Sequence, residues 1–293
     1  MLSEELKQRL SPLRKAQGRP SPLSGATAQA ESGTPAGLGE WFPEGSVSET
    51  ARGELFVCEA SLREICSDAG PLIRRYRAAF RSAARRAARE ALPCYLEPLG
   101  SADAEGCALI DTETAGLHGR PLFMIGLARL EGDDVTLGQY FARDYAEEPA
   151  VLSHFARVLP ELRLLISFNG KAFDWPFVRD RMAYHRLACR ASFEHFDLLH
   201  PSRRRWRSEL PNCKLQTLER YLCGRWRSGD LPGDQIPQRY HDFVRTQDPR
   251  LIAPIFHHNR MDLITMMQLV IALVRDGDRT RSPSEGGRRV GDV

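Results

Sequence analysis

The stretch Ala108-Leu109-Ile110-Asp111-Thr112-Glu113-Thr114 decides the fold expected of this chain. Its apolar run leads directly into Asp-x-Glu, which predicts a strand whose end carries two carboxylates. Side chains at positions i and i+2 share one face of a strand, so Asp111 and Glu113 should project together. Two like charges this close repel unless a cation or a proton lies between them, and Mg²⁺ or Mn²⁺ would meet that need. The alternative is a strand that runs into a solvated turn, because Asp-x-Glu is common by chance.

The sequence around this stretch predicts an α/β fold. Two further apolar segments, 123–128 and 135–140, are joined by an acidic turn and should form an antiparallel three-strand meander with the first strand. Later strands alternate with helices, which favours a mixed sheet with parallel strands, flanked by helices. The expected later strands are 164–168 and 193–199, the expected helices are 147–159, 177–187, 216–222 and 251–275, and 232–237 is expected to be a loop.

The domain organisation follows from shifts in composition. Residues 1–50 are rich in Pro, Ser, Gly and Ala and are expected to be a disordered leader, and the polar residues 277–293 a disordered tail. Residues 51–104 form an accessory segment with a possible strand at 55–58 and a basic amphipathic helix at 71–92, which either follows a phosphate backbone or is a solvated face. The compact domain is predicted at 105–276.

The composition is that of an ordinary soluble protein. The 293 residues are 42% hydrophobic and 27% charged, and the formal net charge of +3 does not by itself indicate a polyanionic partner. The seven cysteines contain no Cys-x-x-Cys pair, which argues against zinc and disulfides and favours a reducing cytoplasm. The sequence shows no signal peptide and no apolar run long enough for a membrane span, so we expect no membrane association. No Gly-rich phosphate loop follows a strand, which argues against a nucleotide cofactor.

A second acidic site is expected at Asp174. It follows Ser-Phe-Asn-Gly-Lys-Ala-Phe-Asp, in which Gly170 permits a tight backbone path and Asn169 can brace it. Phe173 and Trp175 would anchor the segment in the core or stack on a base. The alternative role for Asp174 is to cap the helix that starts at Pro176-Phe177, and a capping Asp can also be a metal ligand.

A third site is expected in His257-His258-Asn259-Arg260-Met261-Asp262. On a helix, His258 and Asp262 are four residues apart and point the same way, while His257 lies about 100° around the helix and could also reach a shared cleft. The alternative is an ordinary surface His-Asp pair, which contributes little.

Together these sites have the composition required for phosphodiester hydrolysis with two metal ions. Four carboxylates on three elements can hold two divalent ions, and a nearby histidine can take a proton from the attacking water. The basic run from Arg203 to Arg207 suits phosphate contact, although such runs are usually solvated faces.

The three motifs resemble those of the DEDD 3′-to-5′ exonucleases of the ribonuclease H-like superfamily. They are Asp111-x-Glu113 after a strand, Asn169-Gly170 before Phe173-Asp174, and His258-Asn259-x-x-Asp262. The YprB-like group is the closer resemblance, because it also has counterparts of Asp197-Leu-Leu-His before the basic run, Lys214-Leu-x-x-Leu-Glu, and Ile236-Pro-x-x-Tyr. The resemblance covers about residues 105 to 275.

This resemblance implies a site and an activity. Asp111, Glu113, Asp174 and Asp262 would bind two Mg²⁺ or Mn²⁺ ions, and His258 would be the general base, with His257 as the alternative. The substrate would be single-stranded DNA or RNA, and the exonuclease direction rests on the resemblance alone. The residues expected to contact substrate are Thr112, Asn169, Lys171, Phe173, Arg203 and Arg205. The competing hypothesis is a non-catalytic nucleic-acid-binding or scaffolding module on the same fold.

Overall fold

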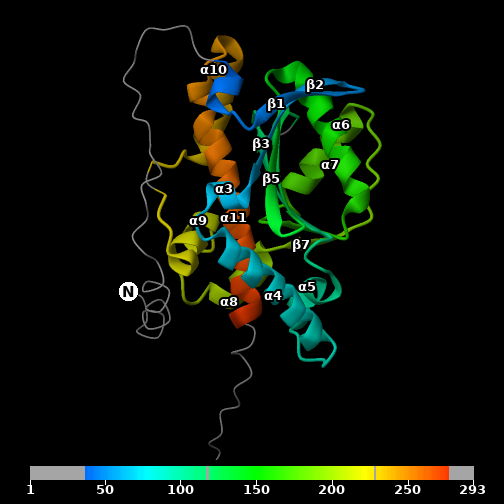
Figure 1. Ribbon diagram of the computed structural model, residues 1–293, viewed down its shortest axis with the longest axis vertical. Coiled ribbons are helices and arrows are strands. Elements are labelled where there is room, and N and C mark those ends of the chain that lie inside the picture. The colour runs from blue at the N-terminus through cyan, green and yellow to red at the C-terminus, as the bar shows by residue number, and fades with distance from the viewer. Residues whose placement is uncertain (1–36, 117–118, 228, 277–293) are drawn as a thin grey trace, which may run out of the picture.

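The computed structural model describes residues 37–116, 119–227 and 229–276. Within this part of the chain, one sheet of seven strands has the order β1-β2-β5-β4-β3-β6-β7 (Figure 1). The strands are β1 (Gly45–Thr50), β2 (Gly53–Ser61), β3 (Cys107–Thr114), β4 (Leu122–Glu131), β5 (Asp134–Phe141), β6 (Leu164–Ser167) and β7 (Glu194–Asp197).

The sheet combines an antiparallel half with a parallel half. Strands β3, β4 and β5 form the predicted antiparallel meander, and β6 and β7 continue the sheet in parallel from the other edge of β3. The predicted fold class, a mixed sheet flanked by helices, is therefore confirmed. Because β3 lies between the two halves, the helices and loops of both can reach its end.

Helices cover both faces of the sheet. On one face, α4 (Ala69–Ala87) and α11 (Ala253–Asp276) pack over β3, β4 and β5, and their apolar side chains share a core with Leu109. On the other face, α6 (Glu148–Val158), α7 (Asp174–Tyr184) and α10 (Ile236–Thr246) pack over Ile110. Residues 109 and 110 thus face opposite cores, as the two-residue period of a strand requires.

The first strands lie outside the predicted compact domain yet belong to the same sheet. The expectation of a disordered leader up to residue 50 is wrong for 38–50, which form α2 (Leu38–Trp41) and β1. Backbone pairing with β2 orders β1, which does not need the large apolar side chains whose absence suggested disorder. Strand β2 pairs with β5, so the segment before residue 105 shares the sheet rather than standing apart from it. Residues 1–36 and the tail 277–293 lie outside the described residues.

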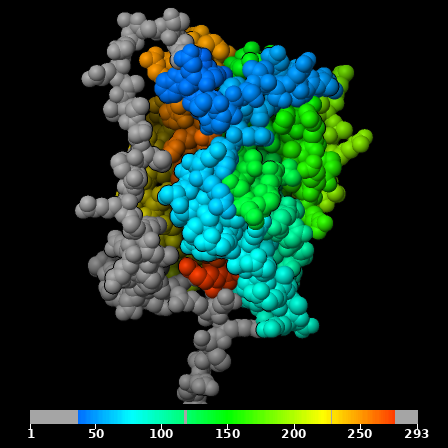
Figure 2. All heavy atoms as spheres, viewed as in Figure 1, coloured from blue at the N-terminus to red at the C-terminus, as the bar shows by residue number. Residues whose placement is uncertain are grey.

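The basic amphipathic helix expected at 71–92 is α4. Its buried side includes Leu72, Tyr76 and Phe80, and it packs against α11 and α5 (Glu97–Ser101). Several of its arginines, among them Arg74, Arg81 and Arg85, are exposed, and the helix lies at the surface of the molecule (Figure 2). The helix therefore contributes to the core through one side and presents positive charge on the other.

The connection from β7 to α11 is more helical than expected. It contains α8 (Leu199–Trp206), α9 (Leu215–Leu218), the π-helical turn η4 (Glu219–Cys223) and α10. The sequence analysis predicted a loop at 232–237 and did not predict α10, which begins at Ile236. The remaining short helices are α3 (Leu62–Ile65), η1 (Cys94–Leu96), η2 (Tyr145–Glu147), η3 (Leu159–Glu161), η5 (Gly233–Gln235) and η6 (Pro249–Leu251). Within the described residues, every helix is too short or too polar to cross a membrane.

Candidate active site

Strand β3 presents Asp111 and Glu113 to the face covered by α11. Both lie an even number of residues after Leu109 and therefore on the same face of the strand, and the side chain of Leu109 packs in the core beneath α11. Glu113 is 8% exposed and Asp111 is half-buried. The β3–β4 register shifts directly after Glu113, so regular pairing ends where the carboxylates stand.

Asp174 reaches the same strand end from α7. It is the first residue of that helix, and its Oδ1 accepts hydrogen bonds from the Thr112 backbone N–H (3.1 Å) and hydroxyl (2.6 Å). Its carboxylate is thus directed to β3, and the position before it, Phe173, makes no side-chain cap. Gly170 leaves room for this arrangement, because a Cβ there would lie 2.4 Å from Ser167 Oγ and 3.1 Å from Asp174 Oδ2.

Helix α11 contributes His258 and Asp262 on one side. Nε2 of His258 lies 3.5 Å from Oδ2 of Asp262, one helical turn later. Nδ1 of His258 lies 3.0 Å from Oδ1 of Asp230, a residue that the sequence analysis did not single out. His257 is exposed. The imidazole of His258 is therefore held between two carboxylates, and Asp230 fixes its orientation.

The four predicted carboxylates lie close enough for their charges to affect the pKa values of Asp111 and Glu113. Removal from water, and then the charges of Asp262, Glu113 and Asp174, raise the pKa of Asp111 well above its usual range. Burial and the charges of Asp262 and Asp174 do the same to the pKa of Glu113. Burial raises the pKa of Asp174 to about 6, although hydrogen bonds from Thr112 oppose this. Carboxylates that penalise one another's ionisation form a site that a divalent cation would stabilise.

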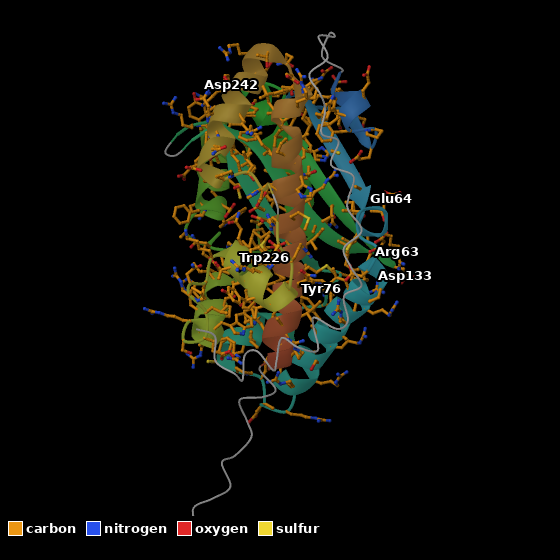
Figure 3. The ribbon with its side chains drawn as sticks, turned by 90° about the vertical axis from the view of Figure 1, so that its left-hand side faces the viewer. Arg63, Glu64, Tyr76, Asp133, Trp226 and Asp242 are labelled. Carbon is orange, nitrogen blue, oxygen red and sulfur yellow. The ribbon has the colours of Figure 1, made fainter. Side chains whose placement is uncertain are left out.

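Arg227 already neutralises part of this charge. Its Nη2 lies 2.6 Å from Oδ1 of Asp262, its Nη1 lies 3.3 Å from Oδ2 of Asp230, and its Nε donates to Oε2 of Glu219 at 2.6 Å. The side chain is only 7% exposed. Arg227 follows η4, and its neighbour Trp226 is exposed beside α11 (Figure 3). Sequence reasoning missed Arg227, because Arg-Trp-Arg resembles any solvated basic run.

The donor set suits hard divalent ions, but its oxygen atoms are engaged within the protein. Among the described residues, no three His, Cys, Asp or Glu side chains are already placed around one point as a metal group. Thr112 binds Asp174, Asn259 binds Asp111, and Arg227 binds Asp262. Carboxylate oxygens are the ligands that Mg²⁺ and Mn²⁺ prefer, so the residues fit such ions once Arg227 yields its place.

Of the residues near Asp174 that were expected to contact substrate, some are hydrogen-bonded within the protein and others have exposed side chains. The backbone N–H groups of Asn169 and Lys171 donate to the Asp197 carboxylate at 2.7 and 3.1 Å, and Asn169 has a left-handed backbone with φ of 66°. Asp197 thereby shapes the turn before Asp174. The side chain of Lys171 is exposed, and Phe173 is 58% exposed. Thr112, in contrast, uses its hydroxyl on Asp174.

The arginines of α8 are set apart from these groups. Helix α8 lies beside the C-terminal end of α11, whereas His258 and Asp262 belong to its N-terminal half (Figure 1). Arg203 is exposed, and Arg205 is paired with Glu209 at 2.5 Å. The structure therefore does not bring Arg203 and Arg205 together with the carboxylates.

A mixed sheet with carboxylates at the end of β3, the strand that joins its antiparallel and parallel halves, is typical of RNase H-like folds, and this class suggests nuclease activity. The profile of the RNase_H superfamily matches residues 108–274, more than half of the chain, so this chain belongs to the RNase H superfamily.

Two known proteins are similar to parts of this chain. The chain is 37% identical over 166 residues to "Uncharacterized protein YprB" of Bacillus subtilis (strain 168), and this region covers 55% of the chain and 40% of the relative. The family B DNA polymerase of the archaeon Pyrobaculum calidifontis is similar in structure, with a TM-score of 0.46 and 16% identity over 57% of this chain and 24% of the polymerase chain. The predicted YprB-like, ribonuclease H-like family is confirmed.

Proposed function

We propose that this protein is a metal-dependent nuclease that removes nucleotides from the 3′ end of single-stranded DNA or RNA. The observation that carries the proposal is that acidic groups from three elements lie near one another: Asp174 is hydrogen-bonded to Thr112, between Asp111 and Glu113, and burial together with the charges of Asp262 and Asp174 raises the pKa values of Asp111 and Glu113. Membership of the RNase H superfamily supports the reaction class, and the DEDD resemblance supports the direction of cutting.

In this proposal the four carboxylates are the ligands of two Mg²⁺ or Mn²⁺ ions. The ions, when bound, would supply Lewis acidity to the scissile phosphate. Thr112 orients Asp174 and Asn259 orients Asp111, so two of the ligands are directed by the protein itself. Arg227 would have to release Asp262 when the ions bind, and Glu219 and Asp230 would still hold its guanidinium.

His258 is the proposed general base. If its Nδ1 carries a proton and donates to Asp230, its Nε2 lone pair faces Asp262 and the site, where it can accept a proton from the attacking water. The same reasoning favours His258 over the exposed His257.

Substrate contacts are proposed for the exposed groups next to Asp174. The ring of Phe173 can stack on a base of a single strand, and the ammonium group of Lys171 can face a phosphate. Arg203 and Arg205 would contact nucleic acid only beyond the site. We also propose a cytoplasmic location, on the composition and cysteine content of the chain.

A non-catalytic nucleic-acid-binding module is the second candidate. One observation favours it, namely the ion pair between Arg227 and Asp262, which neutralises a ligand without a metal. A binding module of this kind would hold nucleic acid and leave it intact.

The test uses 5′-labelled and 3′-labelled single strands of DNA and RNA incubated with the protein and Mn²⁺. Wild type should shorten the strands progressively from the 3′ end, and Asp111→Asn should not. Asp242→Asn is the matched control, because Asp242 pairs with Arg245 on α10 at the surface and should retain activity (Figure 3). Internal fragments would contradict the exonuclease direction, and intact strands bound by wild type would favour the second candidate.

A further inference from the structure

Four residues form a straight row across the sheet beneath α11. Asp111 pairs with Gly126, Gly126 pairs with Gln139, and Gln139 pairs with Cys58, so the row crosses β3, β4, β5 and β2. The sequence analysis had singled out only the first of them. Residues facing one another across a sheet present their side chains on the same face, which here is the face covered by α11.

Two consecutive residues of α11, Asn259 and Arg260, form hydrogen bonds with members of this row. Asn259 Nδ2 donates to Oδ2 of Asp111 at 2.9 Å and to its backbone oxygen at 3.2 Å. Gln139 Nε2 donates to Oδ1 of Asn259 at 3.0 Å, and Arg260 Nε donates to Oε1 of Gln139 at 2.7 Å. Asn259 and Gln139 are fully buried, so the hydrogen bond between them is shielded from water.

The hydrogen bonds from Arg260 through Gln139 and Asn259 to Asp111 form a chain, here called the relay. The chemistry of its two ends fixes the direction in which these bonds are donated. Arg260 can only donate, so the group of Gln139 that faces it must be the carbonyl oxygen. The Gln139 amide nitrogen is then turned to Asn259, whose own nitrogen is turned to Asp111. The backbone oxygen of Asp111, to which Asn259 Nδ2 also donates, can only accept, and therefore both ends require the same orientation of both amides.

Gly126 makes the close approach possible. A Cβ on Gly126 would lie 2.0 Å from Oδ1 of Asn259, and Gly126 is the residue between Asp111 and Gln139 in the row. Only the absence of a side chain on β4 lets the Asn259 amide lie across this strand and reach both neighbours. The sheet and α11 are thus shaped around this amide.

We propose that Asn259 and Gln139 are positioning residues that orient the Asp111 carboxylate toward the metal ions, through a relay that begins at Arg260. This inference rests on the proposed function, because it concerns the same metal site. A purely structural role would require only that buried polar groups be paired, in either direction. A positioning role requires that a nitrogen, not an oxygen, faces Asp111.

Gln139→Glu separates the two roles. The new carboxylate has nearly the same size and keeps the contact with Arg260, but it cannot donate to Asn259. Asn259 must then turn its nitrogen toward the new carboxylate and present its oxygen to Asp111, so the polarity of the relay is reversed. Gln139→Leu removes the donor without adding a charge and guards against a direct electrostatic effect on the metal.

The measurement is the Kd for Mn²⁺ by calorimetry, with a thermal melt of each metal-free variant to verify folding. Loss of a group that orients a metal ligand weakens metal binding by about 10- to 100-fold, and we expect such an increase in Kd for both Gln139 variants. Gln268→Glu is the matched control, because Gln268 also accepts from an arginine, Arg225 at 2.9 Å, and lies on the same helix, so its Kd should be unchanged.

The outcomes separate the two proposals. A Kd equal to that of wild type in folded Gln139→Glu and Gln139→Leu would overturn the relay and leave the metal site standing. Absence of Mn²⁺ binding by wild type would overturn both. If neither Gln139 variant folds, Arg260→Met tests the relay from its 15% exposed end, where the freed Gln139 amide should raise the Kd severalfold and an unchanged Kd would again overturn the relay.

Discussion

The two halves of the candidate site are built in different ways. Asp111 is held by a neutral amide that belongs to a buried network spanning the sheet and α11. Asp262 is held by the guanidinium of Arg227, which comes from the segment after η4 and also contacts Asp230 and Glu219. One carboxylate is therefore oriented without neutralisation, and the other is neutralised by a charge from another segment.

This difference separates geometry from charge balance. Amides leave the negative charge of Asp111 in place, so a metal ion adds to an arrangement that already exists. Arg227 supplies at Asp262 the positive charge that a metal would bring, so the metal must replace it. We infer that the Asp111 half is prepared before metal binding and that the Asp262 half rearranges during it.

Asparagine substitutions at Asp111 and Asp262 should have the largest effects on activity and should test the difference between the two halves most directly. Asp111→Asn and Asp262→Asn should each lower Mn²⁺-dependent cleavage by about 10³-fold or more, because each removes a ligand. Their metal-free stabilities should move in opposite directions, since Asp111→Asn removes a charge that burial disfavours and Asp262→Asn deprives Arg227 of a partner. Thermal melting in EDTA checks this, and a shared direction would contradict the distinction between the halves.

Arg227→Gln should weaken the metal-free protein and strengthen metal binding. Glu219 is 1% exposed and would lose one of its two arginine partners, so we expect a loss of about 3 kcal/mol in the free energy of unfolding. With its competitor removed from Asp262, the Kd for Mn²⁺ should fall. Arg225→Gln is the matched control, because Arg225 pairs with Glu219 at 3.0 Å and should leave the Kd unchanged. A higher Kd in Arg227→Gln would show that Arg227 does not compete with the metal.

Gly126→Ala should disturb only the Asp111 half. The new Cβ would overlap Asn259 Oδ1, and relief of that overlap should cost about 1–3 kcal/mol in the free energy of unfolding. Gly39→Ala in α2 meets open space and should change stability by less than about 0.5 kcal/mol. Urea denaturation measures both. Equal stability of the two variants would mean that the amide can move away from β4 without loss.

The pH dependence of the metal-free protein should distinguish the two halves least, because the acids of both halves contribute to it. Burial raises the folded-state pKa of Asp174 to about 6, above the unfolded value of about 4. The folded state then binds more protons than the unfolded state between these values, so stability should fall as pH rises from about 4 to about 6. Melting curves in EDTA across this range should show the decline, and Asp174→Asn should reduce it. Saturating Mn²⁺ should oppose the decline, because bound cations favour the ionised carboxylates.

Local sequence predicted the elements that carry the site. The two-residue period places Asp111 and Glu113 on one face of β3, and the four-residue spacing of His258 and Asp262 places them on one side of α11. The meander could be predicted because its strands are apolar and only two residues separate β4 from β5. The pairing of β2 with β5 was not predicted, because it depends on backbone contacts between distant segments, which composition does not encode.

By itself, the sequence determined the class of the fold and the residue types available for a metal site, since both follow from periodicity and from the chemistry of side chains. Only the tertiary structure decided how those residues are held. Gln139 lies 120 residues before Asn259, and Arg227, in an irregular segment, pairs with an acid on α11, so neither contact leaves a local signal. The physical reason is that strand register and helix packing determine which buried donors contact which carboxylates. A hydrogen bond is also stronger in the protein interior than in water, and the sequence alone does not show which donors are buried.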